Sequence, residues 1–251
     1  MTRVVGIIPS RYASTRLPGK ALEDILGKPM VQRVYEACRK SDVLDALYVA
    51  TDDQRIAEVV ERIGGSVIMT SPYHVSGTDR LAEAIKSIDA DIVVNIQGDY
   101  PFMNPCMIQE GVDPLLADPD LPMATMMRAV SSPTDLHNPD VVKVIINLKS
   151  EAMYFSRSLI PFPRGYKAHS VYEHIGMFFY RREFLEFFSQ LPPTPLEQVE
   201  KLEQLRVLEH GYRIRVVLTQ CKDSLLSGFS VDTSDDLDRL EEMLNKRGIT
   251  C

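Results

Sequence analysis

The sequence predicts an α/β protein in which helices cover both faces of a mostly parallel sheet. The first observation is a series of short, continuous β-branched runs, such as those at residues 4–8 and 92–96. Runs without alternating polar residues are typical of strands that are buried on both faces. The second observation is that these runs alternate with segments of helical spacing through about the first 130 residues, an order that produces parallel strands.

The first half of the chain supplies the elements of this sheet in order. The first strand is expected at 4–8, and a polar loop rich in Arg, Ser and Gly follows at 10–20. Ser76-Gly77-Thr78-Asp79 is similar to a capping box and is expected to open a helix. The other expected elements are strands at 47–50, 67–69 and 92–96 and helices at 30–38 and 56–63.

The second half has a different rhythm. Strand-like runs at 141–146, 152–155 and 174–180 lie close together in the sequence. They predict a β-rich sub-domain inserted at about 130–195 into a single domain that spans residues 1–251. The later expected elements are helices at 182–190, 196–209 and 234–245, the last N-capped by Ser234, and a strand at 213–218.

The composition limits the partners and the compartment. A formal net charge of -7 argues against non-specific binding to nucleic acid, which depends on a basic surface. No apolar run approaches the ~20 residues of a membrane span, so no membrane partner is expected. No signal-peptide pattern precedes the first strand, so a cytoplasmic location is expected. The cysteines are scattered and are expected to be reduced thiols: Cys38, Cys106, Cys221 and Cys251.

A cluster of cations follows the first strand. Arg11, Arg16 and Lys20 lie on one loop that also contains Pro18 and Gly19. Ligands of open parallel sheets bind at the carboxyl ends of the strands, and such a loop can place cations and backbone N–H groups around phosphates. The loop matches neither the Walker P-loop nor the dinucleotide fingerprint. The alternative is a solvated basic loop without a ligand.

Two acidic residues also follow apolar segments. Asp99 comes directly after the strand expected at 92–96, and Asp232 precedes the last expected helix. Two such carboxylates fit a magnesium ion, which takes a few carboxylates together with substrate phosphates. The alternatives are a turn-forming Gly-Asp pair at Asp99 and a residue that starts a helix at Asp232.

The histidines do not form a metal-binding set. Four of the five are expected at the surface or in turns, whereas His174 starts a strand in a chemically rich region. His174 is therefore either a functional residue or a structural residue of the core. No nucleophile elbow and no Cys/His pair supports covalent catalysis.

Taken together, the motifs resemble the 3-deoxy-manno-octulosonate (Kdo) cytidylyltransferases, also called CMP-Kdo synthetases. The resemblance covers nearly the full chain. Its first block is shared with sugar-nucleotide transferases in general, whereas the blocks after residue 150 are typical of the Kdo enzymes. The blocks are IPSRYASTRLPGK at 8–20, ATDD at 50–53, SGTDR at 76–80, QGD at 97–99, YFSR at 154–157, HIG at 174–176, PLEQ at 195–198, LEQLR at 202–206 and VDT at 231–233.

The resemblance implies a Rossmann-like three-layer sandwich of the nucleotide-diphospho-sugar transferase type, with a β-rich sub-domain that forms a homodimer. It implies a magnesium-dependent cytidylyltransferase that transfers CMP from CTP to the anomeric hydroxyl of Kdo, an acidic eight-carbon sugar, and releases pyrophosphate. The expected setting is lipopolysaccharide synthesis in the cytoplasm.

The same resemblance implies roles for individual residues. Asp99 and Asp232 would bind Mg²⁺ and would form the catalytic set with Arg11 and Lys20. The residues implied to bind the nucleotide are Arg11, Arg16, Lys20, Ser76 and Gly77. The residues implied to line the sugar pocket are Gln97, Arg157, His174, Glu197 and Glu200, with Arg157 as the partner of the sugar carboxylate.

Three residues depart from the family pattern. Tyr100 stands where an acidic residue is usual, Glu173 where a basic residue is common, and Ser230 where Gly is usual. The added carboxylate of Glu173 raises the alternative of a sugar that bears an amine, such as the 8-amino analogue of Kdo. A CMP-sialate-type synthetase is a second alternative, against which the blocks after residue 150 argue. A non-catalytic nucleotide-binding regulatory module is the alternative from another class.

Overall fold

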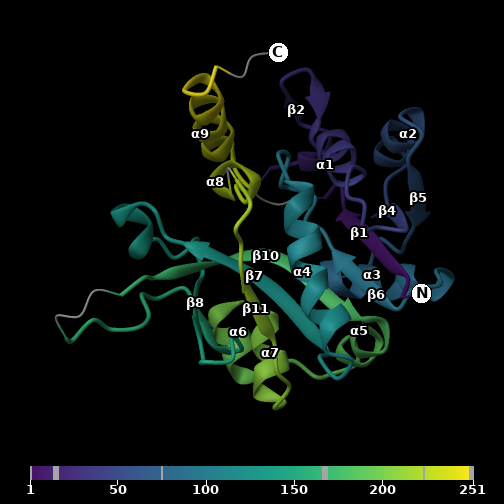
Figure 1. The fold of residues 1–251 in the computed structure, drawn as a ribbon. Helices are drawn as coiled ribbons and strands as arrows, with labels where there is room; N and C mark the ends of the chain where they lie inside the picture. Colours follow the sequence, from purple (N-terminus) through teal and green to yellow (C-terminus); the bar gives the residue numbers. More distant parts are fainter. Residues whose placement is uncertain (1, 14–16, 75, 166–168, 223, 249–251) are drawn as a thin grey trace. The chain divides into compact units, whose positions relative to one another are not determined.

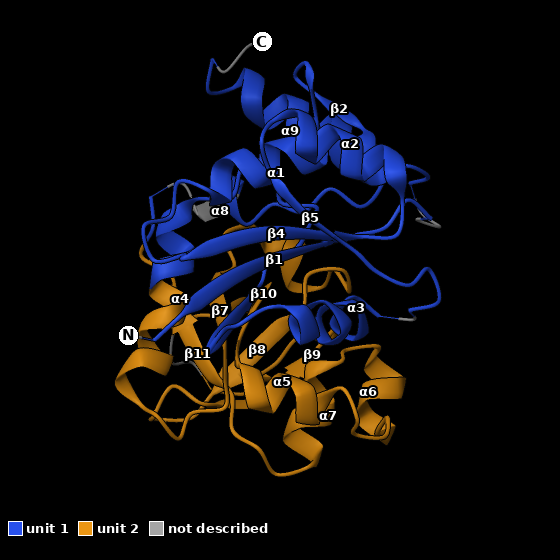
Figure 2. Ribbon diagram, turned by 90° about the vertical axis from the view of Figure 1, so that its right-hand side faces the viewer, with its two compact units in different colours: residues 1–109, 221–251 blue, residues 110–220 orange. Residues whose placement is uncertain are grey.

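The computed structural model describes residues 2–13, 17–74, 76–165, 169–222 and 224–248. The chain forms two compact units, which are coloured separately in Figure 2. Unit 1 contains residues 1–109 and 221–251, and unit 2 contains residues 110–220. No helix in the described part of the chain has the length and apolar character that a membrane crossing requires.

Unit 1 is built on parallel strands, as the sequence predicts (Figure 1). The strands lie in the order β6-β1-β4-β5, and each pair of neighbours is parallel. Val5, Ile7 and Ile8 of β1 are fully buried, which is why this strand has no polar alternation. The strands are β1 (Val4–Ser10), β4 (Ala46–Thr51), β5 (Ser66–Met69) and β6 (Ile92–Asn95).

Three helices connect these strands and cover both faces of the unit 1 sheet. Helices α1 (Met30–Cys38) and α2 (Gln54–Arg62) lead from β1 to β4 and from β4 to β5, and α3 (Gly77–Ala84) leads back to β6. Figure 2 shows α1 and α2 on one face and α3 on the other. Right-handed crossovers produce this arrangement when the strand order reverses. The reversal lies between β1 and β6, where open sheets bind their ligands.

The loops that follow β1 and β6 approach each other closely. A Cβ atom at Gly98 would lie 3.0 Å from the Ser10 hydroxyl oxygen and 3.2 Å from the Pro9 carbonyl oxygen. Only glycine therefore fits without a shift of the β1 end. The loop after β1 continues into a 3₁₀ turn (Lys20–Leu22) and the short strands β2 (Asp24–Ile25) and β3 (Lys28–Pro29).

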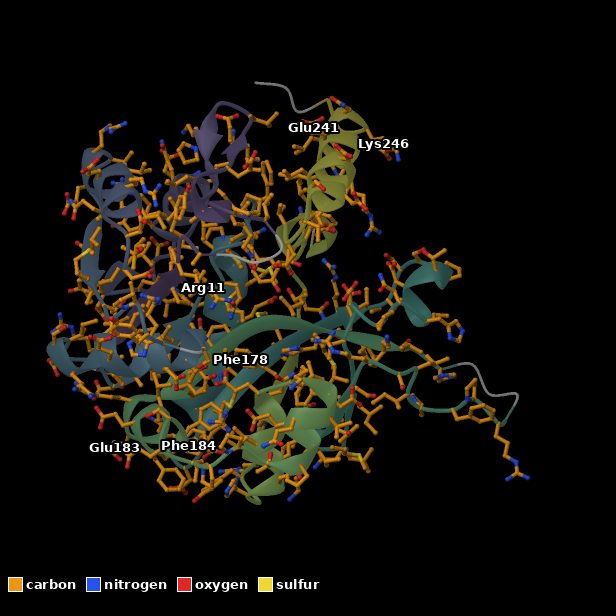
Figure 3. The ribbon with its side chains drawn as sticks, turned by 180° about the vertical axis from the view of Figure 1, so that it is seen from behind. Arg11, Phe178, Glu183, Phe184, Glu241 and Lys246 are labelled. Atoms are coloured by element: carbon orange, nitrogen blue, oxygen red, sulfur yellow. A yellow bond between two sulfur atoms is a disulfide. The ribbon has the colours of Figure 1, made fainter. Side chains whose placement is uncertain are left out.

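The C-terminal segment returns to unit 1. It contains α8 (Ser224–Ser227) and α9 (Ser234–Asn245), and Figure 3 shows the exposed side chains of Glu241 and Lys246 on α9. The predicted N-cap at Ser234 is wrong by one residue. Thr233 is the cap, because its hydroxyl accepts the Asp236 N–H and the Asp236 carboxylate accepts the Thr233 N–H. The buried members of the apolar cluster of this segment are Ile25, Met30, Leu226, Val231, Leu240 and Leu244.

Unit 2 is richer in antiparallel pairs. Strand β10 (Tyr172–Arg181) pairs with β7 (Met123–Ala129) and β8 (Lys143–Ile146), and β8 pairs with β9 (Ala152–Ser156), all antiparallel. Strand β11 (Arg215–Leu218) pairs with β7 in parallel. The remaining elements are a 3₁₀ turn at Pro133–Leu136 and helices α5 (Arg182–Phe188), α6 (Pro195–Glu200) and α7 (Gln204–Glu209).

The helix expected at 196–209 is two helices in the structure. Lys201 has a φ of 55°, in the left-handed region, and ends α6. A non-glycine residue in this region is uncommon, and sequence periodicity does not reveal it. The longest elements that the sequence does not predict are α4 (Pro105–Ala117) and β7. In unit 2, the α4 residue Gly111 packs against Phe179 so closely that no Cβ atom would fit.

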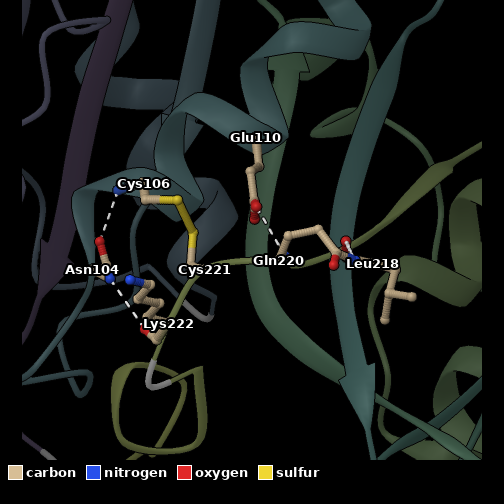
Figure 4. Close-up of a disulfide and its surroundings, with 7 residues drawn as sticks. All are labelled: Asn104, Cys106, Glu110, Leu218, Gln220, Cys221 and Lys222. Atoms are coloured by element: carbon tan, nitrogen blue, oxygen red, sulfur yellow. Dashed lines mark hydrogen bonds between the residues drawn. A yellow bond between two sulfur atoms is a disulfide. The ribbon is translucent and has the colours of Figure 1, made fainter.

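One disulfide contradicts the expectation of reduced thiols. Cys106 at the start of α4 is bonded to Cys221, 115 residues further along the chain (Figure 4). The Asn104 side chain also donates to the Lys222 carbonyl oxygen at 3.3 Å. Cys38 is a buried free thiol, as expected. The spacing of the cysteines could not reveal this pair, because the two sulfur atoms come from segments of unit 1 that are far apart in the sequence.

We predict that reduction of this disulfide lowers the thermal stability. A crosslink that closes a loop of about 100 residues restricts the unfolded chain, and losing a native disulfide typically costs about 2–4 kcal/mol. Differential scanning calorimetry with and without a dithiol should show a fall in Tm of roughly 4–16 °C. The Cys106→Ser variant is the control, because added dithiol should not change its Tm. Equal Tm values for oxidised and reduced wild-type protein would contradict the prediction.

Candidate active site

Two carboxylates from distant parts of unit 1 bond to the ammonium group of one lysine. The Nζ atom of Lys20 donates to Asp99 Oδ2 at 2.7 Å and to Asp232 Oδ1 at 2.9 Å. Lys20 follows β1, Asp99 follows β6, and Asp232 precedes α9. The sequence prediction that Asp99 and Asp232 lie together beside Lys20 agrees with this geometry. Two carboxylates that share one ammonium group are also close enough to share one cation.

Local backbone structure holds these three residues in place. Gly19 has a φ of 74° and precedes Lys20 in the 3₁₀ turn, so the chain reverses there without the strain that a Cβ atom would cause. The Val231 N–H donates to the Asp99 carbonyl oxygen at 2.9 Å. The Asp232 N–H donates to the Asp236 carboxylate at 3.0 Å, which ties Asp232 to the first turn of α9.

The site has the electrostatics of a cation-binding centre. Burial by itself lowers the pKa of Lys20, but the charges of Asp99 and Asp232 and the hydrogen bonds to them outweigh it, and the pKa is raised. The pKa of Asp99 is also raised, first by burial and then by the Asp232 charge, while Lys20 opposes the shift. Like charges in a partly enclosed site cost energy unless a cation compensates them. The two carboxylates supply the hard oxygen ligands that Mg²⁺ takes.

The other residues predicted to bind the nucleotide lie around the ends of the unit 1 strands. Arg11 is exposed directly after β1 (labelled in Figure 3). Ser76 is the N-cap of α3, and its hydroxyl accepts the Asp79 N–H at 3.0 Å. A Cβ atom at Gly77 would lie 3.6 Å from Pro9, so the start of α3 contacts the end of β1. Arg16 lies outside the described residues.

A buried arginine beside this site was not assigned a role from the sequence. Arg80 on α3 is 3% exposed, donates to the Thr70 hydroxyl and lies 3.3 Å from an Asp52 carboxylate oxygen. Burial lowers the pKa of Arg80, Asp52 opposes this, and the positive charge of Arg11 adds to it. Arg80 thus ties the ends of β4 and β5 together. The SGTDR block contained this residue, but nothing in the spacing showed that it is buried.

Unit 2 contains a second polar cluster, formed by Arg157 and Glu200. The Glu200 carboxylate accepts the Ser156 hydroxyl at 2.6 Å and the Arg157 N–H at 3.0 Å. The Arg157 guanidinium donates to the carbonyl oxygens of Glu200 and Pro139, each at 2.8 Å. These bonds fix the plane of the guanidinium group at the end of β9. Arg157 and Glu200, two of the residues predicted to line the sugar pocket, are therefore in direct contact.

Glu197, another predicted sugar-pocket residue, has a structural task in unit 2. Its carboxylate accepts the Thr194 N–H at 3.1 Å, which completes the capping box of α6. The same carboxylate accepts two guanidinium N–H groups of Arg206, at 2.8 and 2.5 Å. Hydrogen bonding to Arg206 and Thr194 lowers the pKa of Glu197 although burial opposes this. A role toward the sugar stays a prediction. In unit 1, Gln97 is half-buried between β6 and Asp99.

His174 lies among aromatic rings on β10. Its Nε2 atom is 2.7 Å from the Thr125 hydroxyl, and its ring makes an edge contact with Phe155 at 5.0 Å between centroids. The Phe178 ring lies 5.2 Å away. Burial lowers the pKa of His174 from 6.5 to about 3. The imidazole is therefore neutral near pH 7. It can donate or accept a hydrogen bond, but it cannot form an ion pair with an anion.

Glu173 does not provide a free carboxylate, which corrects the reason given for an amine-bearing sugar. Adjacent residues of a strand point to opposite faces, so Glu173 and His174 face opposite sides of β10. Glu173 is 8% exposed and forms an ion pair with the Arg128 guanidinium. Burial raises the pKa of Glu173, against the effect of Arg128. Tyr100, a second departure from the family pattern, is buried in unit 1, and Ser230 is half-buried.

Comparison with known proteins decides the family. The model of the family described as Cytidylyltransferase matches residues 5–214. The 3-deoxy-manno-octulosonate cytidylyltransferase of Geobacter metallireducens is 49% identical, with 97% of this chain and 98% of the relative covered. The chain belongs to the 3-deoxy-manno-octulosonate cytidylyltransferase family. The enzyme of the same name from Syntrophobacter fumaroxidans is 50% identical, with 96% of this chain and 97% of the relative covered.

Solved structures agree with this family and with the fold. A CMP:2-keto-3-deoxy-manno-octonic acid synthetase complexed with CTP matches with a TM-score of 0.91 and 41% identity, covering 98% of this chain and 100% of that one. A cytidylyltransferase from Leptospira borgpetersenii matches with a TM-score of 0.63 at 17% identity, which shows a shared fold. The motif resemblance to Kdo cytidylyltransferases and the predicted α/β fold class are therefore confirmed.

We predict that His174 contributes to the pH dependence of stability. His174 takes up a proton near pH 6.5 in the unfolded chain but only near pH 3 in the folded chain. Its contribution to the free energy of unfolding is therefore lost as the pH falls through this window. Urea denaturation should show that the free energy of unfolding falls less between about pH 7.5 and about pH 5 in His174→Gln than in the wild type. His169→Gln, at an exposed position, is the control. Equal losses in wild type and His174→Gln would rule out this contribution.

Proposed function

We propose that the protein transfers CMP from CTP to the anomeric hydroxyl of Kdo. The hydroxyl oxygen attacks the α-phosphorus, the bond to the bridging oxygen breaks, and pyrophosphate leaves. The observation that carries the proposal is the pair of carboxylates on Lys20, located where the strand order of unit 1 reverses. The names of the relatives, which match over nearly the whole chain, support the same reaction.

The cationic side chains of unit 1 would bind the triphosphate. Arg11 and Lys20 would contact its phosphate oxygens, and Arg16 would help. Lys20 already lies at the carboxylates, so the ammonium group can neutralise charge where the leaving pyrophosphate develops it. Ser76 and Gly77 would lie near the cytosine ring, since α3 begins beside the end of β1. Positioning and charge neutralisation supply most of the catalysis in such a transfer.

Asp99 and Asp232 would hold a magnesium ion. Their carboxylate oxygens and the repulsion between their negative charges fit a divalent cation. When bound, Mg²⁺ supplies Lewis-acid stabilisation of negative phosphate charge. Lys20 bridges Asp99, which follows β6, and Asp232, which precedes α9, and the bond from the Val231 N–H to the Asp99 carbonyl oxygen also joins these segments.

The sugar would be recognised by polar groups predicted from the family motifs. Arg157 would contact the sugar carboxylate, with Glu200 holding its backbone N–H and side chain. In unit 2, His174 and Glu197 would line the remaining pocket, and for Gln97 of unit 1 a role toward the sugar stays a prediction from the family motifs. Because His174 is neutral near pH 7, we assign it hydrogen bonding to a sugar hydroxyl and not charge pairing.

Unmodified Kdo is favoured over the alternatives. The Glu173 carboxylate is paired with Arg128, so it does not support a sugar that bears an amine. The relatives are named for Kdo and not for sialate, and an intact Lys20–Asp99–Asp232 cluster argues against a purely regulatory module. A homodimer, lipopolysaccharide synthesis and a cytoplasmic location follow from the family resemblance and stay predictions.

A pyrophosphate-release assay tests the proposed function. It compares CTP with UTP, and Kdo with its 8-amino analogue and sialic acid, in the presence of Mg²⁺. Release is expected with CTP and Kdo, with the highest kcat/KM for that pair. No release with any sugar would overturn the enzymatic assignment, and a preference for the 8-amino analogue or for sialic acid would overturn the choice of sugar.

We predict that Asp99→Ala leaves a folded protein with turnover reduced by about two orders of magnitude or more, because one of two cation ligands is lost. The measurement is kcat for pyrophosphate release, together with the circular dichroism spectrum as a test of folding. Asp238→Ala on the exposed side of α9 is the matched control and should retain wild-type turnover. A near-normal rate for Asp99→Ala would refute the metal assignment.

We predict that Arg157→Lys impairs use of the sugar more than use of CTP, because Lys keeps the charge but lacks the bidentate fork. The KM for Kdo should rise about tenfold, which corresponds to about 1.4 kcal/mol, with little change in the KM for CTP. Arg164→Lys, at an exposed position of the same unit, is the control. A rise confined to the KM for CTP would show that the pocket assignment is wrong.

A further inference from the structure

An exposed arginine on α2 covers the ring of Tyr12 in the basic loop. The guanidinium carbon of Arg55 lies 3.4 Å from the centre of the Tyr12 ring. The Arg55 side chain is 56% exposed, so apolar burial does not explain its position. A guanidinium group over a tyrosine ring is attracted by the negative face of the ring and also stacks on it.

Asp53 fixes this guanidinium from the other direction. It accepts Arg55 Nε at 2.9 Å and Nη2 at 2.7 Å, one bond on each carboxylate oxygen. Asp53 is also the N-cap of α2, since it accepts the Arg55 backbone N–H at 2.9 Å. The fork therefore leaves Arg55 little rotational freedom, and its plane is set by the first turn of a helix.

Tyr12 in turn contacts the end of the loop that carries Lys20. The Gly19 N–H donates to the Tyr12 carbonyl oxygen at 3.2 Å. A Cβ atom at Gly19 would lie 3.3 to 3.5 Å from three atoms of the Tyr12 side chain, so backbone and ring are in contact there. Gly19 directly precedes Lys20, and Arg11 directly precedes Tyr12. The ring thus joins the two ends of the loop.

We infer that Arg55, held by Asp53, is a positioning residue that clamps Tyr12 and thereby pre-orders the basic loop for the CTP triphosphate. This inference rests on the proposed function. Arg55 bonds to Asp53 and contacts Tyr12, and not Lys20, Asp99 or Asp232; its effect passes through the Tyr12 ring to Gly19 and Arg11. An exposed ion pair contributes little to global stability, so the consequence of the contact is local order in the loop. A pre-ordered loop binds its ligand without the cost of ordering it first.

The clamp predicts a specific kinetic pattern. Without it, Tyr12 and Gly19 must be ordered when CTP binds, which raises the KM for CTP by about 2- to 5-fold, the scale of a cation–π contact at an exposed site. The sugar binds through other residues, so the KM for Kdo stays unchanged. Once CTP is bound, Tyr12 and Gly19 are ordered, so kcat stays at the wild-type value.

Steady-state kinetics of Arg55→Met and Arg62→Met test this pattern. Methionine removes the charge and the fork at either position but keeps an unbranched side chain. Arg62 is the matched control, because it is exposed at the other end of α2. Tyr12→Phe should keep the wild-type KM for CTP because it keeps the ring, and Tyr12→Leu should reproduce the Arg55→Met pattern.

Asp53→Asn is a second route to the same result. Asparagine is as good an N-cap as aspartate, so α2 is retained while the charged fork is weakened. The KM for CTP should rise in this variant too, by less than in Arg55→Met. Equal KM values for CTP in Arg55→Met and Arg62→Met, or a loss of kcat without a change in KM, would overturn the clamp.

Calorimetric titration with CTP separates failure of the clamp from failure of the proposed function. If the wild type binds CTP but releases no pyrophosphate with Kdo, the proposed function fails, and the clamp is judged by the Kd for CTP alone. Arg55→Met should then raise that Kd by the same factor of about 2 to 5, with Arg62→Met equal to the wild type. An unchanged Kd in Arg55→Met refutes the clamp irrespective of turnover.

Discussion

The ammonium group of Lys20 is the interaction on which the unit 1 site depends. It joins Asp99, which is 79 residues away in the sequence, and Asp232, which is 212 residues away. The two partly enclosed carboxylates repel each other, and the positive charge of Lys20 compensates that repulsion. Burial raises the pKa of Asp99, the charge of Asp232 adds to this shift, and Lys20 opposes it. Two carboxylates arranged around one positive charge can also hold a divalent cation.

The sheet explains how such distant residues meet. Parallel strands place their carboxyl ends at one edge, and the reversal between β1 and β6 leaves the loops after these two strands side by side. Gly98 allows the second loop to approach the end of β1, and the Val231 to Asp99 bond brings the C-terminal segment to the same place. The strand order therefore determines which loops can cooperate, and the loops determine the chemistry.

Much of unit 1 could be predicted from the sequence, because β1 and β6 are buried on both faces and read as unbroken apolar runs. The charged residues that directly follow such an apolar run could be predicted to lie at the carboxyl end of the sheet. β7 is different: its Met-rich sequence has no strong strand preference, and pairing with β10 and β11 makes it a strand. The disulfide and the end of α6 at Lys201 were missed because they depend on contacts and backbone angles that leave no periodic signal.

The polar residues predicted from family motifs separate into two kinds in the structure. Lys20 bonds to both Asp99 and Asp232, so these three residues form one charged cluster. Glu197 and Glu200 instead cap a helix or hold backbone N–H groups of unit 2. A motif residue can be retained for either reason, and only the contacts distinguish them. Those contacts make the unit 1 cluster the firmer assignment, and they make Arg157, whose plane Glu200 fixes, the strongest candidate of the sugar set.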